Sequence, residues 1–126
     1  NVTAQLFDVE TGAIVGTFLG HSSDVRTAVF SQDGRRVLTA SSDGASLLFD
    51  AHGGRPLATF EIKEPVRSAR FSPDGRKVLT ASKGGTKLFD SAAGKCEVTF
   101  QRQHHGALSA CFSPGGSKVL TAGEDG

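Results

Sequence analysis

A chain of 126 residues is comfortable for one domain and short for two. Its hydrophobic content of 37%, together with 16 glycines, offers enough apolar surface to offset the entropy of ordering, which argues against intrinsic disorder. The formal net charge of +1, and the lack of an apolar run near the roughly 20 residues of a membrane span, give no reason to expect a nucleic acid or a membrane as partner.

Short strands separated by turn signals are predicted along the whole chain. The first two cover residues 2–8 and 14–18, and the last two lie within residues 108–122. The unit after the first pair is predicted to hold four strands, at residues 25–31, 36–40, 46–50 and 57–60. Turns such as Asp33-Gly34 separate them, because glycine adopts the positive φ of a tight hairpin. Helical periodicity is absent, so the pattern indicates an all-β fold.

The sequence repeats itself with a period near 41 residues. The tripeptide Leu-Phe-Asp occurs three times, with phenylalanines 42 and 40 residues apart, at Phe7, Phe49 and Phe89. A Phe-Ser pair recurs every 41 residues, at Phe30, Phe71 and Phe112. Four strands in each such period predict a β-propeller of four-stranded antiparallel blades, in which each sheet covers the apolar face of the next.

These motifs resemble the WD-repeat family over almost the whole chain. Leu-Phe-Asp stands where that family has Trp-Asp at the end of the third strand, and Gly20-His21 stands where it has Gly-His before the innermost strand. The turn Ser41-Ser42-Asp43-Gly44 also matches. The sequence contains no tryptophan, and phenylalanine stands at the tryptophan position of all three motifs. The resemblance implies a non-enzymatic scaffold that serves protein–protein interaction.

The resemblance also implies a hydrogen bond between the histidine before an innermost strand and the aspartate in the turn after the second strand. The middle unit has Ile62 and Gly84 at these places, so both partners are lost together. Joint loss avoids an unpaired buried polar group, which would cost roughly 1–3 kcal/mol. Two structural pairs remain, and neither is interpreted as a catalytic dyad: His21 with Asp43, and His104 (or Gln103 in its place) with Asp125.

The phase of the repeat predicts how the chain is divided. Residues 21–61 and 62–102 form whole blades. Residues 1–20 supply strands three and four of a split blade, and residues 103–126 supply its strands one and two. The single propeller segment of residues 1–126 therefore holds three blade-equivalents.

Three blade-equivalents are too few for a ring, which typically takes about four to eight blades. A single copy would leave sheet edges and apolar blade faces in water. We therefore expect ring closure by homo-oligomerisation, in which the chain is its own partner. A homodimer with six blades is favoured, and a homotrimer with nine blades is the alternative.

Candidate partner contacts lie around the start of the innermost strands, where proteins commonly dock in the family that this chain resembles: Asp24, Arg26, Arg67 and Leu108.

No catalytic residue is predicted, because nucleophile-elbow and phosphate-loop motifs are absent and each Ser-Asp-Gly stretch follows the repeat as a turn. No resident metal or cofactor is predicted. The alternative function is a propeller that binds a metal or small ligand through its histidines or its central channel.

Two cysteines, Cys96 and Cys111, are too few for a disulfide framework. Both fall in predicted strands, where we expect buried free thiols and, from them, a reducing cytoplasmic location.

The sequence has no methionine, tyrosine or tryptophan. With a length of three repeats, this composition is also compatible with an engineered chain or one excised from a larger propeller.

Overall fold

The computed structural model describes residues 2–100 and 106–123, and the regular elements within them are all β-strands. Among these residues, no helix is long and apolar enough to cross a membrane. The strands in chain order are β1 (Ala4–Phe7), β2 (Ile14–Phe18), β3 (Val25–Phe30), β4 (Arg36–Ser41), β5 (Ala45–Asp50), β6 (Ala58–Glu61), β7 (Val66–Phe71), β8 (Lys77–Ser82), β9 (Gly85–Asp90), β10 (Cys96–Phe100), β11 (Ala107–Phe112) and β12 (Val119–Gly123).

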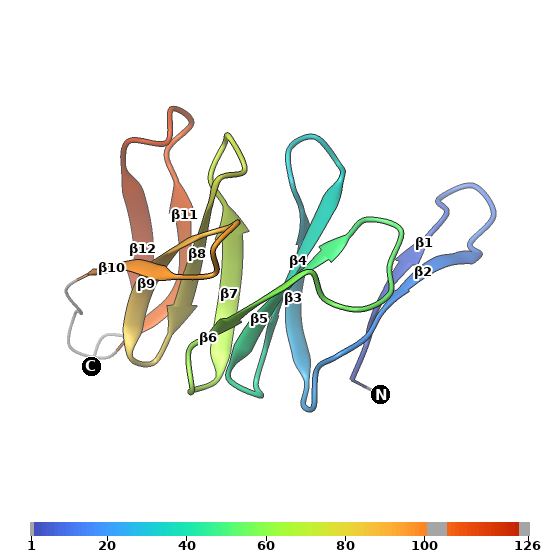
Figure 1. Ribbon diagram of the computed structural model, residues 1–126, viewed down its shortest axis with the longest axis horizontal. Coiled ribbons are helices and arrows are strands. Elements are labelled where there is room, and N and C mark those ends of the chain that lie inside the picture. Colours follow the sequence, from blue (N-terminus) through green and yellow to red (C-terminus); the bar gives the residue numbers. More distant parts are fainter. Residues whose placement is uncertain (1, 101–105, 124–126) are drawn as a thin grey trace.

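The strands form two complete sheets and two hairpins. One four-stranded sheet has the order β3-β4-β5-β6 and the other β7-β8-β9-β10, with antiparallel pairing throughout. We call them blade 1 and blade 2. The hairpins β1-β2 and β11-β12 flank them, and Figure 1 shows the four sheets side by side in chain order. The predicted all-β fold of four-stranded antiparallel sheets is confirmed.

The hairpin turn after each innermost strand has the same hydrogen bonds in both blades. In blade 1, the Asp33 carboxylate accepts a hydrogen bond from the Ser31 hydroxyl at 2.7 Å and one from the Arg35 amide at 3.0 Å. The corresponding turn of blade 2, around Asp74, has both bonds at the same lengths. Gly34 follows with a φ of +74°, a conformation that L side chains rarely adopt. The repeated Ser-x-Asp-Gly motif is therefore a turn.

The core lies between neighbouring sheets. Leu38 and Phe60 of blade 1 share one buried cluster with Val66 and Val78 of blade 2. A second cluster joins β1-β2 to blade 1, and a third joins blade 2 to β11-β12. Each sheet alternates its side chains between its two faces, so a blade needs a neighbour on both sides to bury its apolar residues.

Pairs of phenylalanines mark two of these junctions. The rings of Phe18 and Phe49 have centroids 5.2 Å apart in an edge-on arrangement, and those of Phe60 and Phe89 have centroids 5.4 Å apart. In each pair, the phenylalanine of a Leu-Phe-Asp motif contacts one from the outermost strand of the preceding sheet. Phenylalanine thus supplies apolar contact where the resembled family has tryptophan.

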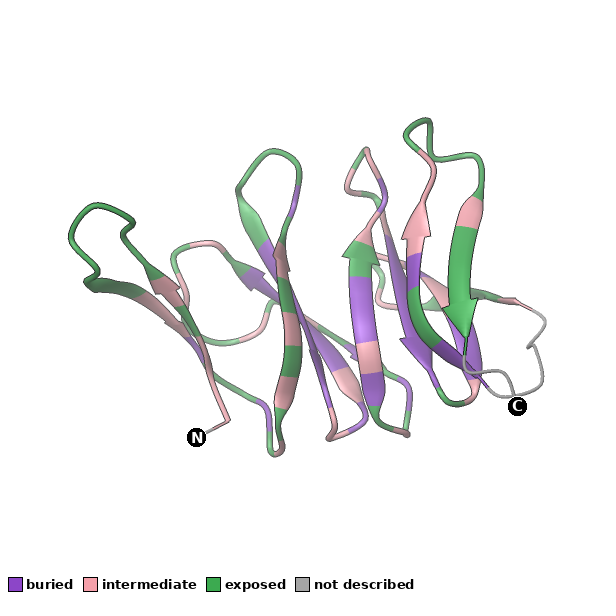
Figure 2. Ribbon diagram, turned by 180° about the vertical axis from the view of Figure 1, so that it is seen from behind, coloured by how far each residue is buried: buried purple, intermediate pink, exposed green. Residues whose placement is uncertain are grey.

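The outward faces of the two terminal hairpins are open. Leu38 and Leu79, in the second strands of blades 1 and 2, are 0% exposed, whereas the repeat-equivalent Leu120 of β12 is 71% exposed. Phe49 is likewise 0% exposed and its equivalent Phe7 is 52% exposed. Figure 2 shows β12 largely exposed beside the buried strands of blade 2. The same residue types are therefore covered in the middle of the arrangement and bare at its ends.

The expectation of buried cysteines is wrong. Cys96 is exposed and Cys111 is only partly buried, and both are free thiols. Cys96 lies on β10, the outermost strand of blade 2, and such a strand has no further strand at its outer edge. Because neither thiol is fully buried, the cysteines give no support to the predicted reducing compartment.

Candidate functional site

A hydrogen-bonded network ties three segments of blade 1 together. Nδ1 of His21, in the loop before β3, lies 2.8 Å from Oδ2 of Asp43, and its Nε2 lies 2.5 Å from the Thr39 hydroxyl oxygen. The Ser22 amide donates to the same Asp43 oxygen at 2.9 Å, and the Ala45 amide donates to the other carboxylate oxygen at 2.9 Å. The structure thus places His21 beside Asp43, as the resemblance implies, and Thr39 of β4 is the strand-two hydroxyl that joins them.

Hydrogen bonds stabilise the charged form of Asp43. Burial raises the pKa of this carboxyl, but the Ser22 amide, the His21 ring and the Ala45 amide together lower it by more. The net pKa of Asp43 therefore lies below its ordinary value of 3.8. The ionised carboxylate accepts hydrogen bonds from a loop and from a turn at once, so its charge is part of what joins them.

A hydroxyl, an imidazole and a carboxylate in this order also make up the triad of a hydrolase. Here Thr39 is 0% exposed and the side chain of His21 is 2% exposed, so the hydroxyl is closed off from any substrate. A nucleophile must reach the atom that it attacks. The burial of this network therefore favours a structural role over a catalytic one.

Blade 2 has a different carboxylate at the corresponding place. Glu64, in the loop before β7, accepts hydrogen bonds from the Gly84 amide and the Ser82 hydroxyl, both at 2.7 Å. A carboxylate from the loop before β7 thus reaches the turn of blade 2 that corresponds to the Asp43 turn of blade 1. Sequence reasoning missed Glu64. Its position two residues after Ile62, which replaces the histidine, was the one sign in the sequence of a substitute acid.

Thr80 shows what the loss of the histidine leaves in blade 2. It stands at the repeat position of Thr39 and is 1% exposed. Within the part of the chain that the structure describes, its Oγ1 has no hydrogen-bond partner. Ile62, in place of His21, offers only apolar contact. The joint loss of the histidine and the aspartate is therefore not neutral, because the buried hydroxyl remains unpaired.

The predicted partner contacts lie at one rim of the sheets. Asp24 and Arg26 are exposed, Arg67 is half-buried and Leu108 is 42% exposed. The Arg26 Nε–H donates to the Ser42 hydroxyl at 2.6 Å. Arg26, Arg67 and Leu108 are each the second residue of an innermost strand, so this rim changes from charged to apolar along the molecule.

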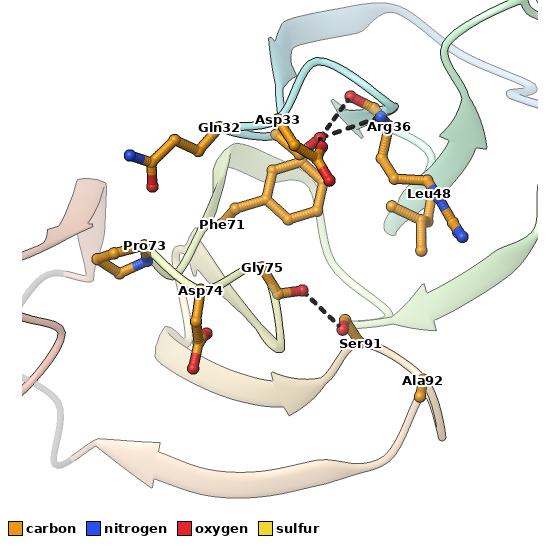
Figure 3. Close-up of a pocket in the computed structure, with 11 residues that line it drawn as sticks. Gln32, Asp33, Arg36, Leu48, Phe71, Pro73, Asp74, Gly75, Ser91 and Ala92 are labelled. Atoms are coloured by element: carbon orange, nitrogen blue, oxygen red, sulfur yellow. Dashed lines mark hydrogen bonds between the residues drawn. The ribbon is translucent and has the colours of Figure 1, made fainter.

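A groove of about 470 Å³ opens at the opposite rim, between the turns of blades 1 and 2 (Figure 3). Phe71 and Leu48 give it apolar walls, and Asp33 and Asp74 lie at its margin. The two carboxylates already accept hydrogen bonds within their own turns. The two carboxylates at its margin are therefore already part of the turns.

Histidines elsewhere do not define a metal site in the described part of the chain. No group of three or more His, Cys, Asp and Glu side chains suited to a metal ion is found among those residues. Nδ1 of His52 lies 2.8 Å from Asp50 in an exposed turn. The predicted pair of His104 and Asp125 lies outside the described residues. Metal or ligand binding stays the untested alternative function.

Comparison with known proteins shows similarity to one repeat family. The family described as "WD40: WD domain, G-beta repeat" matches residues 12–50, 54–90 and 94–126. The relatives include a guanine nucleotide-binding protein subunit beta of Solanum tuberosum, which is 41% identical over 61 residues. Retinoblastoma-binding-like protein E of Dictyostelium discoideum is 34% identical over 61 residues, and THO complex subunit 6 of Arabidopsis thaliana is 38% identical over 52.

These similarities cover parts of each chain. The three alignments span 48%, 48% and 41% of this chain, and 16%, 12% and 14% of the respective relatives. The chain thus matches about a sixth or less of the length of these curated relatives.

Proposed function

The chain belongs to the WD-repeat family, and we propose that it acts as a non-enzymatic scaffold for protein–protein interaction. Proteins with such repeats generally serve as interaction scaffolds. The observation that carries the proposal is the contrast between core and rim. Buried positions such as Leu38 and Leu79 keep the same residue, whereas the rim positions Arg26, Arg67 and Leu108 differ in charge, exposure or both. A surface that recognises a partner needs such local differences, and arginine is a frequent anchor in interfaces.

Affinity capture with matched rim variants tests this proposal. The chain carrying Arg26→Ala and Arg67→Ala is compared with one carrying Arg35→Ala and Arg76→Ala, whose arginines lie on the opposite rim and are exposed. Loss of a hot-spot arginine weakens binding by about tenfold or more. We expect partners of the wild-type chain to be depleted by the first pair of changes and retained by the second. Equal retention in both would contradict a docking surface at the start of the innermost strands.

We further propose that copies of the chain close a propeller ring together. The exposed Leu120 and Phe7, whose equivalents are buried between sheets, support this proposal. Apolar faces of this kind are covered when another sheet packs on them. Two copies would give six blades, inside the common range of about four to eight, and three copies would give nine. The homodimer is therefore favoured over the homotrimer, and the mass in solution distinguishes them.

A further inference from the structure

The rim at the start of the innermost strands differs in charge between the two blades. Blade 1 has one cation there, Arg26, against the carboxylates of Asp24 and Asp43. Blade 2 has a single carboxylate there, Glu64, and three cations: Lys63, Arg67 and Lys83. We propose that this rim of blade 2 binds an extended acidic peptide segment of a partner protein. The inference rests on the proposed docking surface and names the chemistry of the segment that it takes.

The lysines of this rim are departures from the repeat. At their repeat positions, blade 1 has the serines Ser22 and Ser42. At the repeat positions of the two blade 1 carboxylates, blade 2 has Pro65 and Gly84. These four differences all move the rim of blade 2 towards positive charge. The turn itself does not require lysine, because serine serves at the same places in blade 1.

Backbone contacts bring the two lysine-bearing segments together. The Lys63 amide donates a hydrogen bond to the Gly44 carbonyl at 3.0 Å. The carboxylate of the next residue, Glu64, accepts a hydrogen bond from the Gly84 amide at 2.7 Å. Gly84 directly follows Lys83, so the loop that carries Lys63 contacts the turn that carries Lys83. The two lysines therefore share one part of the rim, between the second-strand turns of blades 1 and 2.

Lys63 is held in a backbone conformation that does not favour lysine. Its φ is +68°, and in the described part of the chain no other residue except glycine has a positive φ. This conformation is unfavourable for any residue with a Cβ. The side chain of Lys63 is exposed, so burial in the core does not compensate for the strain. A strained residue with an exposed charge fits a contact with a partner.

Both lysines are available to a partner. Lys63 and Lys83 are exposed, and neither ammonium group forms an ion pair with another described residue. At the opposite rim, by contrast, Lys77 is paired with Asp90 and Glu97. Opposite charges across an interface steer the encounter and fix the orientation of the partner. Carboxylates are therefore the groups that complement this part of the rim.

The same surroundings favour a peptide over a nucleic acid. Asp24 and Asp43 of the neighbouring blade would repel a continuous run of phosphates, whereas a peptide can place its acidic residues over blade 2 alone. Proteins that bind single-stranded nucleic acids also stack bases on aromatic side chains. No aromatic residue occurs in four segments of this rim, at residues 22–26, 42–44, 62–67 and 83–84.

Binding of a short oligoglutamate peptide, measured by fluorescence anisotropy, tests the proposal. The variant K63S/K83S gives blade 2 the serines of blade 1. The control K95S/K118S has the same net charge and loses two exposed lysines of the opposite rim. We expect the control to bind within about twofold of wild type and K63S/K83S to bind about tenfold more weakly. Equal affinities of K63S/K83S and wild type would overturn the proposal.

The variant K63G separates binding from folding. Glycine adopts a positive φ without strain, so this variant should melt at no lower temperature than wild type. We expect it to bind the peptide about threefold to tenfold more weakly, because one ammonium group is lost. A K63G chain that binds as tightly as wild type would remove Lys63 from the proposed contact and refute it.

Two further measurements distinguish the kinds of partner. An oligothymidylate that binds as tightly as the peptide, and is weakened equally by K63S/K83S, would overturn the choice of a peptide. Captured partners that are lost with Arg26→Ala and Arg67→Ala but kept by K63S/K83S would refute the acidic segment and leave the docking surface standing. Partners kept by both variants would instead contradict the proposed function.

Discussion

Thr39 and Thr80 stand at the same repeat position, but their hydroxyl groups differ in hydrogen bonding. The Thr39 hydroxyl contacts His21, whereas no partner for that of Thr80 is present among the described residues. A buried hydroxyl without a partner costs about 1–3 kcal/mol, and removing one partner of a satisfied pair carries a similar cost. Identical substitutions at the two sites should therefore have different effects on stability.

We expect Thr39→Val to lower the free energy of unfolding by about 1–3 kcal/mol, because it leaves a ring nitrogen of His21 unpaired in the core. Thr80→Val should leave the free energy unchanged or raise it by about 1 kcal/mol, since it removes an unpaired group. Urea unfolding of the two variants and wild type at one protein concentration measures both effects. Equal destabilisation by the two changes would contradict the assigned hydrogen bonding.

The lowered pKa of Asp43 predicts a dependence of stability on acid. The folded pKa lies below the unfolded value near 3.8, so the ionised carboxylate stabilises the fold above that value. This contribution is lost as the pH falls through the folded pKa. The difference in unfolding free energy between wild type and Asp43→Asn should be constant from about pH 5 to 7 and shrink below about pH 4. A difference that stays the same down to pH 3 would show that the charge of Asp43 contributes nothing.

Sequence reasoning at this scale succeeded where a residue belongs to the repeat and failed where it does not. His21 and Asp43 were paired from their motif positions, and the structure places them 2.8 Å apart. Glu64 has no acidic counterpart in blade 1, so no periodic signal marked it, and only the folded loop shows that it reaches Gly84. The cysteines were misjudged because a strand pattern does not reveal how well its blade is covered.

At the scale of elements, adjacent glycines in the turn between β11 and β12 separate backbone strain from crowding. Gly116 has a φ of +78°, and Gly115 does not lie in the left-handed region. A Cβ at Gly115 would meet nothing within 4 Å, and one at Gly116 would meet only the Pro73 side chain at 3.5 Å or more. Steric clashes are therefore absent at both positions, and backbone conformation decides the outcome.

We expect Gly116→Ala to destabilise the chain by about 1–2 kcal/mol, because alanine is strained at positive φ. Gly115→Ala should be neutral or slightly stabilising, because it lowers the entropy of the unfolded chain. Thermal unfolding of the two variants under identical conditions measures the contrast. Similar melting temperatures for both variants would mean that the turn does not hold Gly116 in this conformation.

The strands themselves were largely predictable because period-two patterns and Asp-Gly turns are local signals. β3 and β4 lie within one residue of their predicted ranges at each end. β1 is shorter than the predicted residues 2–8, and only Ala4–Phe7 belongs to the strand. A two-stranded hairpin offers fewer pairing partners than a complete sheet, and a sequence pattern does not register that difference.

For the whole molecule, the repeat predicts which faces are apolar but not what covers them. Blades 1 and 2 bury the centre of their shared face, where Leu38 and Val78 are both 0% exposed. The same residue types are bare on β12 and β1, with Leu120 at 71% and Phe7 at 52% exposure. Local patterns specify each sheet, whereas the closure of a ring depends on the number of sheets that meet.

The mass of the 126-residue chain in solution tests the closed ring most directly. Light scattering coupled to size exclusion, over a hundredfold range of concentration, compares the particle with the single-chain mass of 13.1 kDa. We predict a monodisperse particle of twice that mass, made by two chains that close one ring. A monodisperse particle of 13.1 kDa throughout this range would contradict the account.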